Sequence, residues 1–325
     1  MKRWILRLVG LLAVPVVVAV GLLGYAHLQI RRLAPDLPSD QVVLALSSEP
    51  DLPVRLAVIH TASQVAPRSQ VLDPARDPAP DEAYVMSHPA FALRWQDGRI
   101  LLIDTGMTPD AARRFGKTLE LVGAAPAEPH GSLVEQLGAA VTRVEAVLFT
   151  HLHTDHTDGV GPLCGAVGPR RITLFQTPGQ AELTNHMTWA GRAHLEQATC
   201  LESRRLDAAA LAPVPGFPGV GVIHAAGHTP GSQMVVAAVG SHATRLYAFA
   251  GDVVNHVDGI RHDVPKPLLY RLVVVPESDG QLARLRTFLA RLERQAGARL
   301  VVSHHFGQIE SLMLDPIESL GQGLD

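Results

Sequence analysis

Apolar and polar residues are distributed along this chain in a way that predicts one long apolar segment followed by a mixed α/β body. Residues 8–26 are apolar throughout and show no polar face. From residue 55 onward, short apolar runs typical of strands are interspersed with runs that have helical spacing. The predicted strands are 55–60, 91–95, 99–103, 144–149, 172–175, 220–225, 234–239, 246–250 and 300–302, and the predicted helices are 109–122, 132–140, 179–197 and 279–295.

The apolar segment is long enough to cross a membrane. A helix over residues 8–26 would be about 28 Å long, close to the thickness of a bilayer core. Basic residues precede it at positions 2, 3 and 7 and follow it at positions 31 and 32, a distribution that favours an N-terminus inside and a body outside. A signal peptide cleaved near Gly24-Tyr25-Ala26 is the alternative.

These features divide the chain into three parts. We expect residues 1–32 to be a membrane anchor or signal segment, residues 33–53 a tether, and residues 54–325 one folded domain. Either form of the N-terminus exports the body. It is expected to be anchored in the inner (plasma) membrane on the periplasmic or extracytoplasmic side, or secreted to that side. In such a compartment Cys164 and Cys200 either form one disulfide or stay as two buried thiols, and the sequence leaves both open.

Composition narrows the class of protein. About 47% of the chain is hydrophobic, which excludes a disordered protein. With 28 basic and 31 acidic residues the net charge is −3, and basic residues form no broad patch along the sequence. Nucleic acid is therefore not expected as a partner, and a small molecule is. The oligomeric state is left open.

Side chains that bind metals are concentrated directly after the strand predicted at 144–149. His151, His153, Asp155 and His156 lie within six residues. On a regular strand His151 and His153 would share one face, and a turn after them would direct the next two side chains to a second point. This spacing suits two adjacent metal ions better than one.

Other predicted strands also end on metal-binding residue types. Asp104, Asp252 and His304 each follow a strand, and His228 lies in the turn 227–232. Loops at strand ends are held by a rigid sheet, so these side chains are candidates for one shared site. His305 is the alternative to His304, because only one of two neighbours can point inward.

The ordered set Asp104, His-x-His-x-Asp-His, His228, Asp252 and His304 resembles the five motifs of the metallo-β-lactamase-fold hydrolases, over roughly residues 55–310. The resemblance implies an α+β fold, a four-layer αββα sandwich. It implies that one metal is held by His151, His153 and His228, that the other is held by Asp155, His156 and His304, that Asp252 bridges the two, and that Asp104 orients the ligands from behind. Two Zn²⁺ ions per chain are expected, and iron or manganese would accept much of the same ligand set.

The remaining histidines are expected to be ordinary polar residues outside the site: His60, His88, His130, His186, His194, His224, His242 and His262. His256 follows Asp252 by four residues and could approach the site, but we expect it at the surface.

The expected chemistry is hydrolysis by a hydroxide activated by the dinuclear metal centre, which attacks the carbonyl of an ester, lactone or thioester. Asp155 is the expected catalytic residue, orienting the hydroxide and carrying a proton to the leaving group. Phosphodiesterase and β-lactamase activities of the same fold are alternatives. The β-lactam-cleaving members generally lack an Asp at the bridging position, so Asp252 favours the other classes. Lactonases of the family often have a Tyr three residues after that Asp, whereas this chain has Asn255.

A mononuclear-iron persulfide dioxygenase is a third alternative, since some members of the fold have this activity. Metal content distinguishes the two activities: two zinc ions per chain favour hydrolysis, and one iron ion favours oxidation.

Overall fold

The computed structural model describes residues 2–240 and 243–321, with side chains from residue 14 onward. Its strands form two sheets, of order β4-β1-β2-β3-β5-β6-β7 and β12-β11-β10-β9-β8. The first contains β1 (Arg55–Ala66), β2 (Tyr84–Arg94), β3 (Ile100–Ile103), β4 (Glu128–Pro129), β5 (Val144–Leu148), β6 (Ile172–Gln176) and β7 (Leu201–Arg205). The second contains β8 (Ala212–Pro213), β9 (Val220–His224), β10 (Gln233–Val239), β11 (Arg245–Phe249) and β12 (Arg299–Val301).

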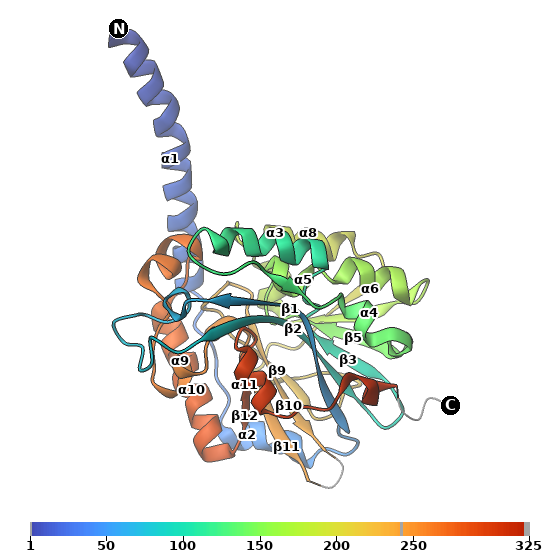
Figure 1. The fold of residues 1–325 in the computed structure, drawn as a ribbon. Coiled ribbons are helices and arrows are strands. Elements are labelled where there is room, and N and C mark those ends of the chain that lie inside the picture. Colours follow the sequence, from blue (N-terminus) through green and yellow to red (C-terminus); the bar gives the residue numbers. More distant parts are fainter. Residues whose placement is uncertain (1, 241–242, 322–325) are drawn as a thin grey trace.

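Helices cover the outer faces of both sheets (Figure 1). The α-helices are α1 (Lys2–Arg31), α2 (Asp40–Ala45), α3 (Pro109–Glu120), α4 (Leu133–Leu137), α5 (Thr154–Thr157), α6 (Val160–Val167), α7 (Pro178–Glu182), α8 (Trp189–Gln197), α9 (Asp258–Arg261), α10 (Asp279–Ala296) and α11 (Phe306–Ser311). Short 3-10 or π turns occur at η1 (Leu46–Ser48), η2 (Arg68–Gln70), η3 (Gly138–Arg143), η4 (Gly251–Val253), η5 (Tyr270–Val274) and η6 (Ile317–Leu320).

The packing of β3 shows why the sheets are sandwiched. All four of its side chains are buried, and successive ones point to opposite faces. Leu101 and Ile103 join the core between the two sheets, together with Phe91 and Phe249. Ile100 and Leu102 join the core under α4, α6 and α8. A third core lies between the second sheet and α10. The αββα sandwich expected from the resemblance is therefore confirmed.

The sheet topology gathers the candidate site at one edge. β3 and β5 are parallel, as are β11 and β12, so the residues that follow each strand emerge at the carboxyl ends. Most of the predicted strands are present within one or two residues. The predicted helix 179–197 is not continuous: it is divided into α7 and α8 by a turn in which the Asn185 side chain accepts a hydrogen bond from the Met187 amide. Cys164 and Cys200 form a disulfide, which settles the alternative that the sequence left open.

The N-terminal helix α1 projects from the body (Figure 1). Its stretch Val14–Arg31 is long and apolar enough to cross a membrane, with a mean hydropathy of 1.4. A signal sequence would pass the same test. The end of α1 is nevertheless packed on the body, since Ala26 and Ile30 are completely buried.

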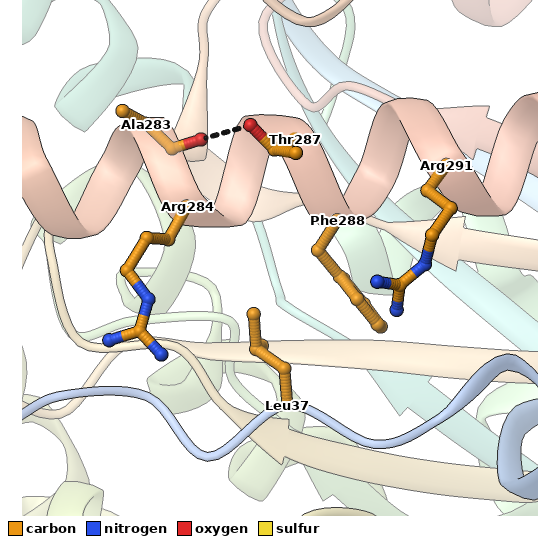
Figure 2. A pocket seen from close by; sticks show the side chains of 6 residues that line it. All are labelled: Leu37, Ala283, Arg284, Thr287, Phe288 and Arg291. Carbon is orange, nitrogen blue, oxygen red and sulfur yellow. Dashed lines mark hydrogen bonds between the residues drawn. The ribbon is translucent and has the colours of Figure 1, made fainter.

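Residues 33–53, for which the sequence predicts a tether, lie against α10. Figure 2 shows a groove in which Leu37 faces Phe288, with Arg284 and Arg291 on either side. Arg291 donates a hydrogen bond to the Asp40 carboxylate at 2.9 Å. Farther along, Val43 and Leu46 are buried in the core between the second sheet and α10, so this segment packs on the folded domain. None of the residues that line the groove is a metal-binding candidate.

Candidate metal centre

The first donor group is formed by His151, His153, His228 and Asp252. Their ligand atoms all lie within 4.8 Å of one another. His228 Nε2 is 3.2 Å from His153 Nδ1 and 3.4 Å from Asp252 Oδ2. His151 and His153 come from the loop after β5, whereas the other two come from the second sheet. The two sheets therefore contribute jointly to one cluster.

The second donor group shares the same aspartate. His304 Nε2 lies 3.1 Å and His156 Nε2 lies 3.5 Å from Asp252 Oδ1. Asp155 completes this side, with its Oδ2 atom 3.5 Å from His304 Nε2 and 3.7 Å from His156 Nε2. The Asp252 carboxylate therefore lies between the two groups: Oδ2 is the oxygen near His228, Oδ1 is the oxygen near His156, and His304 Nε2 is 3.1 Å from both.

The backbone before Asp252 explains how it reaches this position. Gly251 has φ of +52°, in the left-handed region that favours glycine. A Cβ at this position would come 2.9 Å from Cβ of Thr150, in the loop after β5. The sharp turn after β11 is therefore open only to a residue without a side chain, and it aims the carboxylate between the two donor groups.

The donors fit metal ions because several have no other partner. The Nε2 atoms of His151, His153 and His156 and Oδ1 of Asp252 are buried without a hydrogen bond. Leaving a buried polar atom unpaired costs about 1–3 kcal/mol, so such a concentration is expected only where a ligand fills the space. Imidazole nitrogens and carboxylate oxygens are the donor set that Zn²⁺ accepts.

Charges in the cluster point the same way. Burial alone would raise the pKa of Asp252 and of Asp155, but the surrounding imidazoles hold the pKa of both carboxyls below the ordinary value. Burial lowers the pKa of His151 well below its usual range and the pKa of His153 to about 3. The first donor group therefore combines an ionised carboxylate with neutral imidazoles, which is the protonation state needed to bind a cation. In the second group burial would lower the pKa of His156 and His304, but the carboxylates around these rings outweigh it and raise both pKa values.

Outer partners fix the orientation of the histidine rings. His156 Nδ1 donates to Asp104 Oδ2 at 2.8 Å, and Asp104 also accepts from the Thr150 amide and hydroxyl. His304 Nδ1 donates to the Ser87 carbonyl at 2.8 Å. Each bond leaves Nε2 of the ring free to face the cluster. Asp104 thus lies behind the donors, on the Nδ1 side of the His156 ring.

Glu277 and Lys266 are site residues that the sequence did not single out. Glu277 Oε1 lies 2.5 Å from His228 Nδ1 and 2.7 Å from Lys266 Nζ. Lys266 Nζ also donates to the Asp252 carbonyl at 2.7 Å. All of these groups are buried. The only sequence signal is that a Lys and a Glu occur in an apolar neighbourhood, which is too general to identify them.

Two histidines differ from the sequence expectation. His88, expected outside the site, is buried on β2 with Nδ1 3.2 Å from Asp155 Oδ2, and its donor atom groups with those of Asp155 and His304. A strand residue of this kind has no motif around it, and only the pairing of β2 with its neighbours brings it there. His256, expected at the surface, is buried and stacks on His305, with the two ring centroids 3.7 Å apart.

His305 itself turns away from the donor cluster. Its Nδ1 accepts a hydrogen bond from the Val257 amide at 3.3 Å. Its neighbour His304 is the one whose ring enters the cluster. Arg68 closes the far side of the histidine stack through a 3.0 Å contact with His256 Nε2. His242 lies outside the described residues.

A tyrosine from another segment approaches the place where Asn255 stands. The ring of Tyr270 lies 5.3 Å from Lys266 Nζ. Burial raises the pKa of Tyr270 well above its ordinary value, and the carboxylates of Glu277, Asp252 and Asp155 raise it further, while hydrogen bonding from the Asn255 side chain opposes them. The phenol is therefore protonated at neutral pH, and its ring lies next to Lys266, which itself contacts Asp252.

Comparison with solved structures shows the same architecture in characterised hydrolases. A B. thuringiensis AiiA variant with N-decanoyl-L-homoserine bound at its active site has a TM-score of 0.58 and 15% identity, covering 80% of this chain and 96% of that one. An N-acyl homoserine lactone hydrolase with its product at the catalytic metal centre gives the same values. AidC, a dizinc quorum-quenching lactonase, has a TM-score of 0.51 and 14% identity, covering 78% of this chain and 91% of that one.

No curated protein sequence matches the chain. A sequence profile of the metallo-beta-lactamase superfamily, however, matches residues 83–304. The match begins just before β2 and ends at His304, so it spans every residue of the cluster described above. The chain belongs to the metallo-beta-lactamase superfamily.

Proposed function

We propose that this protein is a membrane-anchored hydrolase that uses two zinc ions to cleave an ester, lactone or thioester on the extracytoplasmic side. The observation that carries the proposal is the position of Asp252, whose carboxylate lies within 3.5 Å of buried donors from both groups. A superfamily fold with a dinuclear donor set supports a metal-dependent hydrolase. The bond cleaved and the metal are the parts that we propose.

The proposed ligands follow from the two donor groups. His151, His153 and His228 would hold one ion, Asp155, His156 and His304 the other, and Asp252 both. Ions bound there would acidify a water molecule and polarise the substrate carbonyl. No serine or cysteine nucleophile is then needed, and the only two cysteines are joined in a disulfide.

Asp155 is the residue that we propose to move a proton. Its carboxylate is buried between His88 and His304 and stays ionised. An ionised carboxylate beside the attacking water can accept its proton and then deliver it to the leaving oxygen or sulfur. His88 holds Asp155 in position, because its Nδ1 lies 3.2 Å from Oδ2, the carboxylate oxygen that also faces His304 and His156.

Tyr270 supports a carbonyl substrate. A protonated phenol beside the cluster can donate a hydrogen bond to the oxygen on which negative charge develops during attack. The Asn255 side chain is close enough to the phenol to lower its pKa. The departure from the lactonase pattern at residue 255 is thus compensated by a side chain fifteen residues farther along. Lactones are accordingly the first substrates to test.

The packing of α1 supports an uncleaved anchor. Cleavage after Ala26 would separate the buried side chains of Ala26 and Ile30 and would expose the end of the helix that lies on the body. Five side chains between Val14 and Val20 are more than half exposed, as expected for a surface that contacts lipid.

The test uses the full chain purified in mild detergent. Metal content is measured by elemental analysis, and turnover is measured on a panel of lactones, esters, thioesters, β-lactams and phosphodiesters. Two zinc ions with a preference for a carbonyl substrate would support the proposal, whereas one iron ion with persulfide oxidation or a preference for phosphodiesters would refute it. His153→Ala should abolish turnover, and His262→Ala, a change at an exposed histidine, should not.

A further inference from the structure

An exposed apolar segment lies between two residues of the metal centre. Leu268, Leu269, Leu272, Val273 and Val274 are 54%, 74%, 45%, 55% and 56% exposed. Contiguous apolar side chains are seldom left in water by a soluble domain, and such a patch marks a contact with another apolar surface. The apolar segment, residues 268–274, includes the π turn η5 (Tyr270–Val274).

Both ends of this apolar segment are fixed beside His228. Lys266, just before it, and Glu277, just after it, form a buried ion pair at 2.7 Å, and Glu277 contacts the His228 ring. Between them Tyr270 turns inward toward Lys266, while the leucines and valines point outward. The segment therefore forms an arch whose inner side belongs to the metal centre and whose outer side is apolar.

The apolar arch also contacts the N-terminal helix. Nε2 of His27 lies 3.0 Å from the Leu272 carbonyl oxygen, and Nδ1 lies 3.1 Å from the Glu277 carbonyl oxygen. In Figure 1 the arch is the orange coil beside the base of α1, where the helix leaves the body. The outer side of the arch is thus continuous with the exposed apolar surface of α1, on which Tyr25 and Leu28 are 61% and 49% exposed.

We propose that the arch 268–274 rests in the surface of the bilayer that α1 spans, so that the metal centre takes an amphiphilic substrate with a long acyl chain from the membrane. The substrate half of this proposal rests on the proposed function. The bilayer is the surface that the arch contacts because the arch adjoins α1. If α1 crosses the bilayer, the adjoining arch lies at the level of the lipid headgroups and upper acyl chains.

Charge on the arch agrees with a lipid surface. Its one charged side chain, Arg271, is 17% exposed and pairs with Asp279 at 2.7 Å, so the outward side presents no free carboxylate to the headgroups. In this arrangement the acyl chain of the substrate stays among the lipids while its carbonyl enters beneath Tyr270. Only the outward side of the arch then needs to be apolar.

The first experiment measures membrane contact directly. The native cysteines are joined in a disulfide, so single-cysteine variants can be labelled selectively. Leu269→Cys and the matched control Met313→Cys, at an 84% exposed apolar residue on another part of the surface, are labelled with a polarity-sensitive fluorophore. The full chain is then reconstituted into phosphatidylcholine vesicles that contain brominated lipid. We expect quenching at position 269 but not at 313. Equal access of both probes to an aqueous quencher would overturn the proposal.

The second experiment tests the substrate class with Leu269→Asp and Met313→Asp. In vesicles, Leu269→Asp should lower kcat/KM for a membrane-partitioned long-chain lactone by about tenfold or more, the effect of exposing one leucine-sized contact. It should leave kcat/KM for a short-chain soluble lactone within about twofold, because the Leu269 side chain is 74% exposed on the outward side of the arch. Met313→Asp should change neither value. An equal loss of kcat/KM on both substrates would contradict the proposed substrate class. No cleavage of either lactone by the unaltered protein would refute the proposed function. The membrane contact is decided separately, by the quenching result.

Discussion

The Glu277 carboxylate lies 2.5 Å from Nδ1 of His228, on the opposite side of the ring from Nε2, which faces Asp252. Burial would raise the pKa of Glu277, but the Lys266 ammonium and the His228 ring hold the pKa of that carboxyl below its usual value. Glu277 is therefore an ionised acceptor that fixes the tautomer of His228.

Replacing Glu277 by Gln should weaken metal binding without removing the ligand itself. The amide retains an acceptor but loses the charge, and loss of such an outer partner typically costs about 10–100-fold in metal affinity. Metal competition titrations would measure the change, and turnover should recover in excess zinc. Glu310→Gln, at an exposed carboxylate that contacts His60, is the control. Unchanged affinity in Glu277→Gln would show that the contact does not position His228.

Removing the bridging carboxylate should affect both ions. Asp252→Ala is expected to reduce metal content from two ions per chain to one or none, because each donor group loses an oxygen. Elemental analysis after dialysis gives the content, and a lactone assay should show a loss of about 100-fold or more. Chelation of the unaltered protein should produce the same loss and should be reversed by zinc. A variant that retained two ions and full turnover would exclude Asp252 as the shared ligand.

Tyr270→Phe should slow turnover while leaving the metal site intact. Loss of one donor to a developing oxyanion typically lowers kcat by about 10²–10³-fold. KM and metal content should change little, since the ring and its contact with Lys266 remain. Asn255→Ala should reproduce part of the effect, because the Asn255 side chain lowers the pKa of the phenol. Equal kcat for Tyr270→Phe and the unaltered protein would mean that the phenol has no part in the reaction.

The disulfide should contribute substantially to stability. Cys164 and Cys200 are separated by 36 residues, and the chain-entropy model gives about 4 kcal/mol for a loop of that size. Denaturant unfolding of Cys164→Ala/Cys200→Ala, followed by tryptophan fluorescence, should show a correspondingly lower free energy. Reductant should shift the unaltered protein toward the double variant and leave the variant itself unaffected. Coincident curves for the two proteins would contradict the expectation.

The buried guanidinium of Arg68 provides a test of pH dependence. Its bidentate partner Asp77 accepts two hydrogen bonds, at 2.6 and 3.0 Å, and this bonding keeps the pKa of Asp77 below its ordinary value. A lowered carboxyl pKa stabilises the fold at pH values above the pKa of the unfolded chain, near 3.9. This contribution is lost as the pH falls through the pKa of the folded protein.

Asp77→Asn should therefore cost about 3 kcal/mol of unfolding free energy near neutral pH, because it leaves a buried charge without one partner. The difference from the unaltered protein should stay constant from about pH 5 to 8 and narrow below about pH 4. Asp110→Asn, at an exposed i,i+3 pair, is the control and should be neutral. A difference that did not vary with pH would show that the charge of Asp77 is not the cause.

The sequence alone determined the parts of this protein that depend on neighbouring residues. Strands such as β3 and β5 are short apolar runs with polar ends, and hydrophobic burial places such runs in a sheet wherever they occur. The run from His151 to His156 is dense enough in imidazoles and carboxylates to identify a metal site without coordinates. The superfamily and the αββα fold followed from the order of these motifs, and both are confirmed.

Only the tertiary structure decided which other side chains accompany that run. His88, Lys266 and Glu277 occur in segments without a motif, and each reaches the metal centre because the two sheets pack face to face with their carboxyl ends at one edge. The joining of α1 to the arch through His27 is likewise invisible in the sequence. Local patterns record the preferences of adjacent residues, whereas contacts between distant segments depend on how complete layers pack, which no single stretch of the chain specifies.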